Sequence, residues 1–348
     1  MKAAVLYGNE DIRYDDYPEP QVRPGTVKIR VKACGICGSD IPRVLANGAH
    51  FYPIVLGHEF SGIVQEIGAE TKTALKIGDH VAVAPLVPCM ECEDCRNGLY
   101  SLCKHYSFIG SREQGAYAEY IVVPAGNAVK IDDAVPFEQG ALFEPSTVAL
   151  HGIEFAKFVP GGSVAVVGGG TIGTFTAQWA RILGASKVVV FGRDRKHLEL
   201  SKRLGADQVI STLDEDYLDQ AIKATEGRGF DWVFEAAGTQ ATIKLCFQIA
   251  GNRSTISLIG TPTGDLTFSK SEWEQINRKE LFVTGSWMSG NAPYPGDEWS
   301  RTAQCFASGQ LRFDPEIFYA VFDLKDADQA FALFQEKGKV KGRVLLKI

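Results

Sequence analysis

Positive charge, long apolar runs and an apolar leader are what this sequence lacks. Its 36 lysine and arginine residues are outnumbered by 42 aspartate and glutamate residues among 348, which gives a net charge of −6. Nucleic-acid-binding domains carry a clustered basic face, so this balance argues against a nucleic-acid partner. No apolar run approaches the roughly 18 residues that a membrane span needs, and the N-terminal segment lacks the apolar core of a signal peptide. We therefore expect a cytoplasmic protein with neither a nucleic-acid nor a membrane partner.

Cysteine is scarce but unevenly placed. Only eight cysteines are present, yet Cys89, Cys92, Cys95 and Cys103 all fall within residues 88–104. Thiols stay reduced in the cytoplasm, which disfavours disulfides, and the C-P pair that ends a ferredoxin-type motif is absent. Acidic residues between the cysteines disfavour a zinc ribbon that binds nucleic acid. Four thiolates at these spacings can converge on one tetrahedral ion, so the segment predicts a closed, structural zinc site.

The pattern of apolar residues changes at about residue 151. Before it, segments such as "TVKIRVKACGI", with apolar Val27, Ile29 and Val31, predict half-buried strands. After it, six short apolar runs alternate with helical patterns between residues 163 and 286. This alternation predicts a parallel sheet covered by helices on both faces. We expect an α/β protein in which a β-rich domain precedes a doubly wound domain at residues 151–286.

A glycine-rich loop opens the second domain. "VAVVGGGTIG" places Gly168, Gly170 and Gly173 in a G-x-G-x-x-G pattern, with Thr171 and Ile172 inside it, between a predicted strand and a predicted helix. These glycines permit a tight turn, close approach of the backbone to a pyrophosphate and close packing of helix on sheet. A merely flexible turn is the alternative, and we favour a nicotinamide dinucleotide site.

The residue that usually recognises NAD is missing from its expected place. About 20 residues beyond the loop, where an acid would bind the ribose hydroxyl, the chain has Gly192 followed by Arg193. A guanidinium in place of a carboxylate suits the 2′-phosphate of NADP, so we predict NAD or NADP with NADP favoured. In the alternative, Asp194 reaches back to the ribose or Arg193 is a solvated loop residue.

A second candidate metal site has fewer ligands. Cys37, His58 and Glu59, together with Glu144 far along the chain, offer one thiolate, one imidazole and a carboxylate. Three protein ligands with an open position are typical of catalytic zinc, and either Glu59 or Glu144 could complete the set. Asp40 is a candidate partner for the other nitrogen of His58, and Ser39 is a candidate proton relay.

These segments together resemble the zinc-dependent medium-chain dehydrogenase/reductase family over essentially the whole chain. The resemblance is carried by "GHEFSGIVQEIG", by the four-cysteine segment, by "GGGTIG" and by Glu144 within "FEP". It implies a GroES-like catalytic domain built from residues 1–150 and 287–348, a Rossmann cofactor domain at residues 151–286, and a homodimer or homotetramer. No cysteine lies near Glu144, so the chain is similar to the polyol dehydrogenase branch. That similarity implies that Cys37, His58 and Glu144 hold a catalytic zinc with Glu59 nearby, which makes two zinc ions per chain.

A narrower resemblance concerns the substrate. "CGSDIPRVLANGAHFYPIVLGHEFSG", "FIGSREQGAYAEYIVV" and "GSWMSGNAPYPGDEW" are similar to members that act on a phosphorylated polyol, which implies oxidation of galactitol 1-phosphate to tagatose 6-phosphate. Arg43 stands where sorbitol-type members have tyrosine, and its charge suits a phosphate unless it pairs with a local carboxylate. Further candidate substrate residues, any of which could instead serve packing or loop structure, are Asn47, His50, Trp287, Asn291 and Trp299.

Other functions stay open at this point. The same chemistry could serve an unphosphorylated polyol such as sorbitol or xylitol, or another secondary alcohol. A non-catalytic protein that keeps the fold and senses a nucleotide is a different class, which an intact open metal site disfavours.

Overall fold

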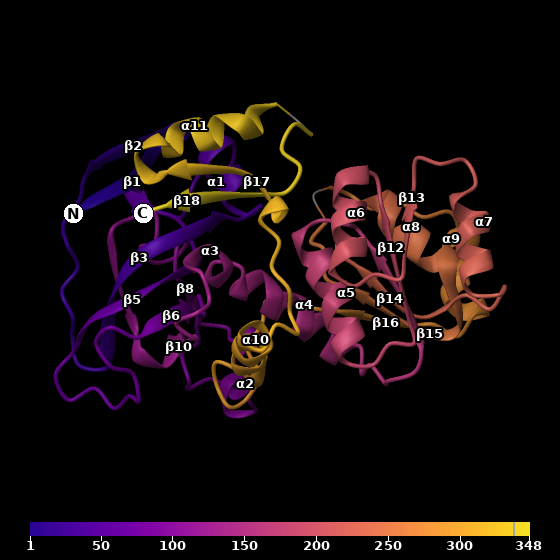
Figure 1. The fold of residues 1–348 in the computed structure, drawn as a ribbon, viewed down its shortest axis with the longest axis horizontal. Helices are drawn as coiled ribbons and strands as arrows, with labels where there is room; N and C mark the ends of the chain where they lie inside the picture. The colour runs from indigo at the N-terminus through magenta and orange to yellow at the C-terminus, as the bar shows by residue number, and fades with distance from the viewer. Residues whose placement is uncertain (263, 337) are drawn as a thin grey trace. The chain divides into compact units, whose positions relative to one another are not determined.

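The structure is a computed structural model that describes residues 1–262, 264–336 and 338–348, shown as a ribbon in Figure 1. Within these residues the chain divides into two compact units. Unit 1 comprises Met1–Glu144, Ser289–Gly309 and Phe318–Ile348, and unit 2 comprises Pro145–Met288 and Gln310–Ile317. The first unit is therefore assembled from both ends of the chain.

Unit 1 is built mainly from antiparallel strands. Its strands are β1 (Lys2–Gly8), β2 (Asp11–Asp16), β3 (Thr26–Ile36), β4 (Ile54–Val55), β5 (Glu59–Ile67), β6 (His80–Val83), β7 (Leu86–Val87), β8 (Ser107–Phe108), β9 (Tyr120–Pro124), β10 (Ala128–Lys130), β17 (Phe318–Asp323) and β18 (Arg343–Lys347). The largest sheet has the order β10-β6-β5-β3-β18-β17, with β9 also paired to β3. Smaller sheets have the orders β2-β1-β4 and β7-β8. The last strand, β18, lies antiparallel to β3 and parallel to β17, which ties the C-terminal segment into the first unit.

Unit 1 also contains short helices and 3-10 turns. They are α1 (Asp40–Leu45), α2 (Glu93–Arg96), α3 (Phe137–Gly140), α10 (Asp297–Ala307) and α11 (Ala327–Ala332), with 3-10 turns η1 (Tyr100–Leu102), η2 (Ala125–Asn127), η4 (Leu324–Asp326) and η5 (Leu333–Gln335). α1 follows β3 directly, so the turn between them carries the Cys37–Asp40 segment.

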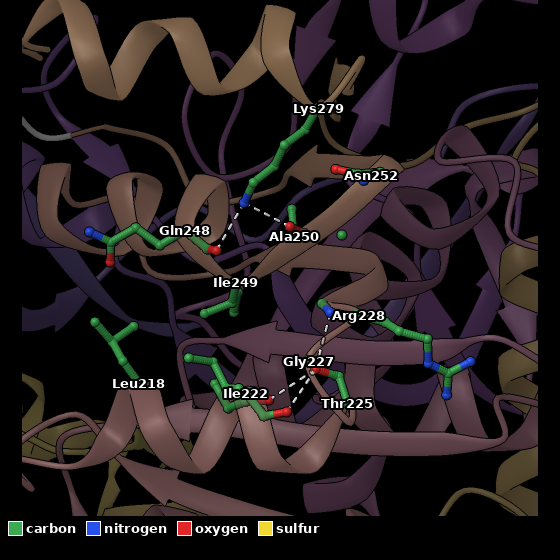
Figure 2. A pocket seen from close by; sticks show the side chains of 13 residues that line it. Leu218, Ile222, Thr225, Gly227, Arg228, Gln248, Ile249, Ala250, Asn252 and Lys279 are labelled. Atoms are coloured by element: carbon green, nitrogen blue, oxygen red, sulfur yellow. Dashed lines mark hydrogen bonds between the residues drawn. The ribbon is translucent and has the colours of Figure 1, made fainter.

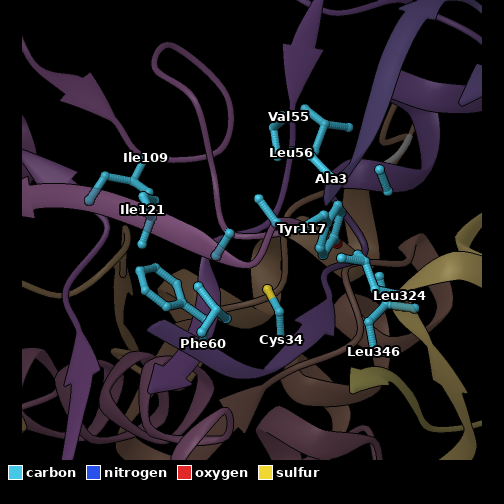
Figure 3. Packing of buried hydrophobic residues seen from close by; sticks show 14 of the residues in the cluster. Ala3, Cys34, Val55, Leu56, Phe60, Ile109, Tyr117, Ile121, Leu324 and Leu346 are labelled. Atoms are coloured by element: carbon cyan, nitrogen blue, oxygen red, sulfur yellow. The ribbon is translucent and has the colours of Figure 1, made fainter. Parts of the chain in front are cut away.

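β3 is more deeply buried than its alternating sequence predicts. Even Lys28 is only 6% exposed, and its ammonium pairs with Glu19 at 2.9 Å and Glu66 at 3.2 Å. Elsewhere in this stretch the predicted alternation is present, because Val27, Ile29 and Val31 are buried while Arg30 is exposed and Lys32 is partly exposed. Its apolar residues contribute to one large core, and Figure 3 shows part of that core, with Cys34 and Phe60 near Tyr117 and Leu346.

Unit 2 is a six-stranded parallel sheet of order β13-β12-β11-β14-β15-β16. Its strands are β11 (Ser163–Val167), β12 (Lys187–Gly192), β13 (Gln208–Ser211), β14 (Phe230–Glu235), β15 (Ala250–Leu258) and β16 (Phe282–Gly285). Its helices are α5 (Thr171–Ile182), α6 (Arg195–Leu204), α7 (Tyr217–Ala224), α8 (Gln240–Ile249) and α9 (Lys270–Arg278), with η3 (Pro315–Ile317) and most of α4 (Phe143–Phe155). The strand order reverses between β11 and β14, as in doubly wound dinucleotide-binding folds. The six predicted strands and the predicted fold class are confirmed.

The borders of the two units are not those of the predicted domains. The chain passes from unit 1 to unit 2 after Glu144 and returns after Met288, and residues 310–317 group with unit 2. In the described parts of the chain, no helix combines the length and apolar character that a membrane span requires.

Candidate functional site

Pairing of β3 with β5 assembles the first candidate metal site. Gly35 lies opposite Glu59 in this ladder, so the turn after β3 brings Cys37 beside His58 and Glu59. Ligand atoms of these three residues all lie within 4.8 Å of one another. His58 and Glu59 are 3% and 1% exposed. A Cβ at position 35 would approach Glu59 Oε2 to 2.6 Å, which explains the glycine there.

The electrostatics of this group fit a cation. Glu59 Oε2 and His58 Nδ1 are buried without a hydrogen-bond partner, and an unpaired buried polar atom costs about 1–3 kcal/mol. Burial, followed by the charge of Glu59, raises the pKa of the Cys37 thiol. A metal ion among these atoms would offset the unpaired acceptor and draw the thiol into its thiolate form. The residues present therefore fit zinc, which favours cysteine and histidine ligands.

Asp40 lies beside His58, behind the candidate metal ligands. Its carboxylate has no exposed surface, and Oδ1 is 3.6 Å from His58 Nδ1. Tyr117 donates its hydroxyl to Asp40 Oδ2 at 2.9 Å, and Arg43 Nη1 lies 3.2 Å from Asp40 Oδ1. With Nδ1 facing a carboxylate, Nε2 is the nitrogen left to bind a metal.

Glu144, at the start of α4, stands outside the tight three-residue group but interacts with it. Loss of hydration raises the pKa of its carboxyl to about 7, and the negative charge of Glu59 acts in the same direction. A carboxyl with a raised pKa responds strongly to a nearby cation. The four residues thus share one electrostatic environment, with Glu59 nearer to the thiol and imidazole in this arrangement.

Sequence reasoning missed Arg343. This arginine is 8% exposed in β18, and its Nη1 lies 2.9 Å from Glu59 Oε1 and donates to the Ile36 carbonyl at 3.2 Å. It offsets part of the negative charge of Glu59 while leaving Oε2 free to face another cation. Its signal in the sequence is weak, a single arginine that opens the buried apolar run "RVLL", and its partner lies 284 positions away.

Arg43, in the last turn of α1, contacts Ser39, the N-cap of the same helix. Arg43 Nη1 donates to the Ser39 carbonyl at 2.8 Å and to Ser39 Oγ at 2.9 Å. Arg43 also forms an ion pair with Asp40. Pairing with a local carboxylate was the predicted alternative to binding of a phosphate. Only Nη1 takes part in these contacts, so Nε and Nη2 of this 23% exposed side chain face no partner among the described residues.

The remaining candidate substrate residues differ in exposure. Asn47 and His50 are exposed in the loop after α1, and Trp287 is 49% exposed in unit 2. Asn291 instead donates to Glu298 Oε1 at 2.8 Å. Trp299 is 1% exposed within α10, so the structure argues against a substrate contact for its indole because no open surface reaches it.

The four cysteines around α2 converge. Their sulfurs all lie within 4.8 Å of one another, and Sγ–Sγ distances of 3.9 Å separate Cys89 from Cys95 and Cys92 from Cys103. A tetrahedron with metal–sulfur bonds of about 2.3 Å has edges of about 3.8 Å, so the spacing fits a zinc ion. Backbone N–H groups, that of Cys95 first, lower the pKa of Cys92 to about 6, which favours the thiolate. All four are free cysteines, not disulfides.

The glycine loop borders a cavity of about 610 Å³ at the carboxyl ends of the unit 2 strands. Gly168 has φ +119°, and a Cβ on Gly173 would overlap the Gly168 carbonyl. Of the predicted nucleotide residues, the wall includes Gly168, Gly170, Gly192 and Arg193, whereas Thr171, Ile172 and Gly173 form the first turn of α5 behind it.

The side chain of Asp194 caps the helix that follows it. It is the N-cap of α6 and accepts the His197 N–H at Oδ1, 3.0 Å away. Both residues line the cavity wall, where Arg193 is exposed and Asp194 is partly buried. This arrangement leaves the arginine, more than the aspartate, available to a ligand.

A second cavity of unit 2, about 400 Å³, lies at the opposite, amino edge of the sheet (Figure 2). The Lys279 ammonium points to the end of α8, where it donates to the carbonyls of Phe247, Gln248 and Ala250 at 2.8–3.0 Å. Ligands of parallel sheets bind at the carboxyl edge. We therefore assign no ligand to this cavity and interpret Lys279 as a structural cap of α8.

Comparisons with known proteins identify the family of the chain. Residues 23–133 match the family model described as "Alcohol dehydrogenase GroES-like domain", and residues 171–308 match "Zinc-binding dehydrogenase". The chain is 37% identical to galactitol 1-phosphate 5-dehydrogenase of Escherichia coli K12 over 91% of this chain and 92% of that protein. It is 32% identical to sorbitol dehydrogenase of Bacillus subtilis over 76% of each.

Two solved structures have the same fold. The crystal structure of galactitol-1-phosphate dehydrogenase from Escherichia coli superposes with a TM-score of 0.93 at 36% identity, covering 100% of both chains. A putative zinc-binding dehydrogenase from Sinorhizobium meliloti, bound to NADP, superposes with a TM-score of 0.89 at 29% identity, covering 100% of this chain and 99% of that one.

Proposed function

Because this chain belongs to the zinc-dependent medium-chain dehydrogenase/reductase family, whose members here are alcohol and polyol dehydrogenases, we propose that it oxidises a polyol phosphate with a nicotinamide cofactor. The reaction we assign is the conversion of galactitol 1-phosphate to tagatose 6-phosphate. The observation that carries it is the 37% identity, over 91% of the chain, to a relative named for that substrate. The buried Cys37–His58–Glu59 group supplies a place for the chemistry.

We assign residues 1–150 and 287–348 to the GroES-like catalytic domain and residues 151–286 to the Rossmann cofactor domain. The order of the two family matches along the chain supports this assignment. Two zinc ions per chain would be held at different sites, the catalytic ion by Cys37, His58 and either Glu59 or Glu144, and the structural ion by the four cysteines around α2.

The residues of the catalytic site have distinct roles in this scheme. A zinc ion bound there supplies a Lewis acid that lowers the pKa of a substrate hydroxyl. Asp40, 3.6 Å from His58 Nδ1, is placed to orient the imidazole, and Arg343 balances the charge of Glu59. Ser39 Oγ takes the proton that the hydroxyl loses and passes it towards solvent. A nicotinamide nucleotide, when bound, would supply the hydride acceptor that oxidation of a secondary alcohol to a ketone requires, with NAD(P)⁺ reduced to NAD(P)H.

For Arg43 we propose a divided role. Nη1 anchors the guanidinium to Ser39 and Asp40, and the remaining nitrogens bind the phosphate of the substrate. The pairing of Arg43 with Asp40 is also compatible with a second candidate function, oxidation of an unphosphorylated polyol. The sorbitol dehydrogenase relative is named for such a substrate.

The experiment compares initial oxidation rates of galactitol 1-phosphate, galactitol and sorbitol by zinc-replete enzyme. A higher kcat/KM for the phosphate ester, lowered in Arg43→Ala, supports the assignment. A preference for free polyols that Arg43→Ala does not change would replace it with the second function.

For the cofactor we propose NADP in preference to NAD. Arg193 is exposed in the cavity wall while Asp194 caps α6, and the Sinorhizobium meliloti relative binds NADP. Measuring kcat/KM with each nucleotide tests this, and Arg193→Ala should reduce the value for NADP selectively. Equal or better turnover with NAD would contradict it.

We also place the enzyme in the cytoplasm as a homodimer or homotetramer. Eight free cysteines suit a reducing compartment. Light scattering of the purified protein would give the number of copies.

A further inference from the structure

Glu235, which the scheme above does not use, is a buried carboxylate that directly precedes two residues of the nucleotide cavity wall, Ala236 and Ala237. It ends β14, the central strand next to β11, and has no exposed surface. The loss of hydration raises the pKa of its carboxyl. A buried carboxyl in an otherwise apolar strand, "FDWVFE", is unfavourable unless it is hydrogen-bonded.

The partners of this carboxylate include backbone groups of the next turn, beside the Thr242 side chain at the start of α8. Oε1 accepts the N–H groups of Ala237 and Gly238, both at 2.9 Å, and Oε2 accepts the Gly238 N–H at 3.1 Å. The main-chain carbonyl of Glu235 accepts from Ile259 and Gly260 at 2.9 and 3.0 Å. One residue thus joins the end of β14, the turn at residues 236–239 and the segment after β15.

The space around Glu235 is filled. A Cβ at Gly260 would come within 2.6 Å of Glu235 Oε2 and 2.9 Å of the Ala237 nitrogen. On its other side the turn packs against the nucleotide loop, since a Cβ at Gly168 would meet Ala236 and Ala237 at 3.1 Å. The turn therefore has little room to move while its two N–H groups stay bound to Glu235.

This turn is part of the cavity wall. Ala236, Ala237 and Thr239 line the same 610 Å³ space as Gly168 and Arg193. We propose that Glu235 is a positioning residue for the cofactor, because it fixes the wall formed by residues 236–239 through their N–H groups. The inference rests on the proposed use of a nicotinamide cofactor.

The strand order indicates which half of the cofactor depends on it. A doubly wound sheet binds one mononucleotide on each side of the strand-order reversal, here between β11 and β14. Gly192 and Arg193, at the end of β12, lie on the side that recognises the adenosine ribose. The side that begins with β14 is left for the nicotinamide nucleotide, so Glu235 should matter for the dinucleotide and little for AMP.

The test uses full-length, zinc-replete Glu235→Gln. Glutamine has the same shape but presents an NH₂ group where a carboxylate oxygen accepted N–H, so the turn must shift. Glu272→Gln is the matched control, because Glu272 also accepts a backbone N–H, from Ser269 at 2.7 Å, but lies in α9 and does not line the cavity. Glu235→Asp, which keeps the charge and shortens the side chain, is made in parallel in case the glutamine variant does not fold.

Dissociation constants for the reduced cofactor and for AMP are measured by fluorescence and calorimetry. We expect Kd for the better of NADH and NADPH to rise about tenfold in Glu235→Gln, with AMP affinity and the control unchanged. Wild-type affinity for the reduced cofactor in a folded Glu235 variant would overturn the inference, as would equal losses for AMP and dinucleotide. If the wild-type enzyme binds neither NADH nor NADPH, the proposed function itself fails.

Discussion

The properties of the candidate zinc ligands depend on single residues that are far away in the sequence. Asp40 faces His58, but its carboxylate is held by Tyr117, 77 positions away. Glu59 pairs with Arg343 from the last strand. Hydrogen bonds to groups that contact metal ligands orient the ligands and tune their affinity, so these two partners should matter although neither reaches the metal.

Tyr117→Phe removes one hydroxyl and leaves Asp40 Oδ2 without its 2.9 Å donor. We expect zinc affinity at the Cys37–His58 site to fall by about tenfold, the lower end for such outer contacts, because Asp40 is then free to turn away from His58. Unfolding free energy should fall by about 1–3 kcal/mol for the unpaired buried acceptor. Competition with a chromophoric chelator gives the affinity and urea titration the stability.

Tyr106→Phe is the control for that experiment. Its hydroxyl has only a 3.5 Å contact with exposed Arg112, so both quantities should stay unchanged. Wild-type zinc affinity in Tyr117→Phe would show that the hydrogen bond from Tyr117 to Asp40 does not contribute to zinc binding.

Zinc binding at this site should depend on pH. Burial raises the pKa of the Cys37 thiol, and that of Glu144 is raised to about 7. A raised pKa means that protons compete with zinc, so affinity falls as pH falls. Each proton released makes the affinity change about tenfold per pH unit.

The slope of this dependence also distinguishes the two carboxylates. If Glu144 is the ligand, Glu144→Gln should make the slope below pH 7 less steep by about tenfold per unit, because one competing proton is removed. If Glu59 is the ligand, with Glu144 uninvolved, Glu144→Gln leaves the slope unchanged. Chelator competition between pH 6 and 8 measures it, and an affinity independent of pH would contradict the whole ligand set.

At the scale of elements, helix ends and strand ends carry most of the site chemistry. The turn after β3 holds Cys37, the strand ends of unit 2 hold Gly192 and Glu235, and the end of α8 is capped by Lys279 (Figure 2). The carboxyl end of a helix presents unpaired carbonyls and negative potential, which a lysine side chain satisfies.

Lys279→Met should destabilise the protein by about 1–3 kcal/mol, since three carbonyl oxygens of α8 and β15 lose a charged donor. Turnover should be unchanged because the residue lies at the edge of the sheet opposite the nucleotide loop. Lys270→Met, which alters an 88% exposed side chain with one 3.6 Å contact, is the matched control. Equal urea midpoints for the two variants would mean that the cap contributes nothing.

The elements that could be predicted from sequence are those with local signals. Apolar runs of unit 2 predict six strands because buried parallel strands need no alternation, and "GGGTIG" predicts the strand–loop–helix at Gly168. In β3 the alternating pattern does not predict the burial of Lys28, since its acidic partners Glu19 and Glu66 lie elsewhere in the sequence. Arg343 and Tyr117 were missed because nothing near them in the sequence shows that Glu59 and Asp40 will be their partners.

At the scale of the whole molecule, the candidate metal groups and the candidate nucleotide cavity lie in two units with different architectures. An antiparallel unit carries both candidate zinc groups, and a parallel unit carries the candidate nucleotide cavity. Family membership extends over both, and 37% identity to a relative covers 91% of the chain. Relatives named for galactitol 1-phosphate and for sorbitol both align with this chain at 30% identity or more.

The central claim is that Cys37 and its neighbours hold a zinc ion that the oxidation of a polyol phosphate requires. Its most direct test measures zinc content and the rate of NAD(P)H formation from galactitol 1-phosphate in wild type and in Cys37→Ser. Cys246→Ser, a buried cysteine outside both sulfur-containing groups, is the control. The account predicts two zinc ions and turnover in wild type and control, and one zinc ion with a rate at least about 100-fold lower in Cys37→Ser. Wild-type zinc content and turnover in Cys37→Ser would contradict it.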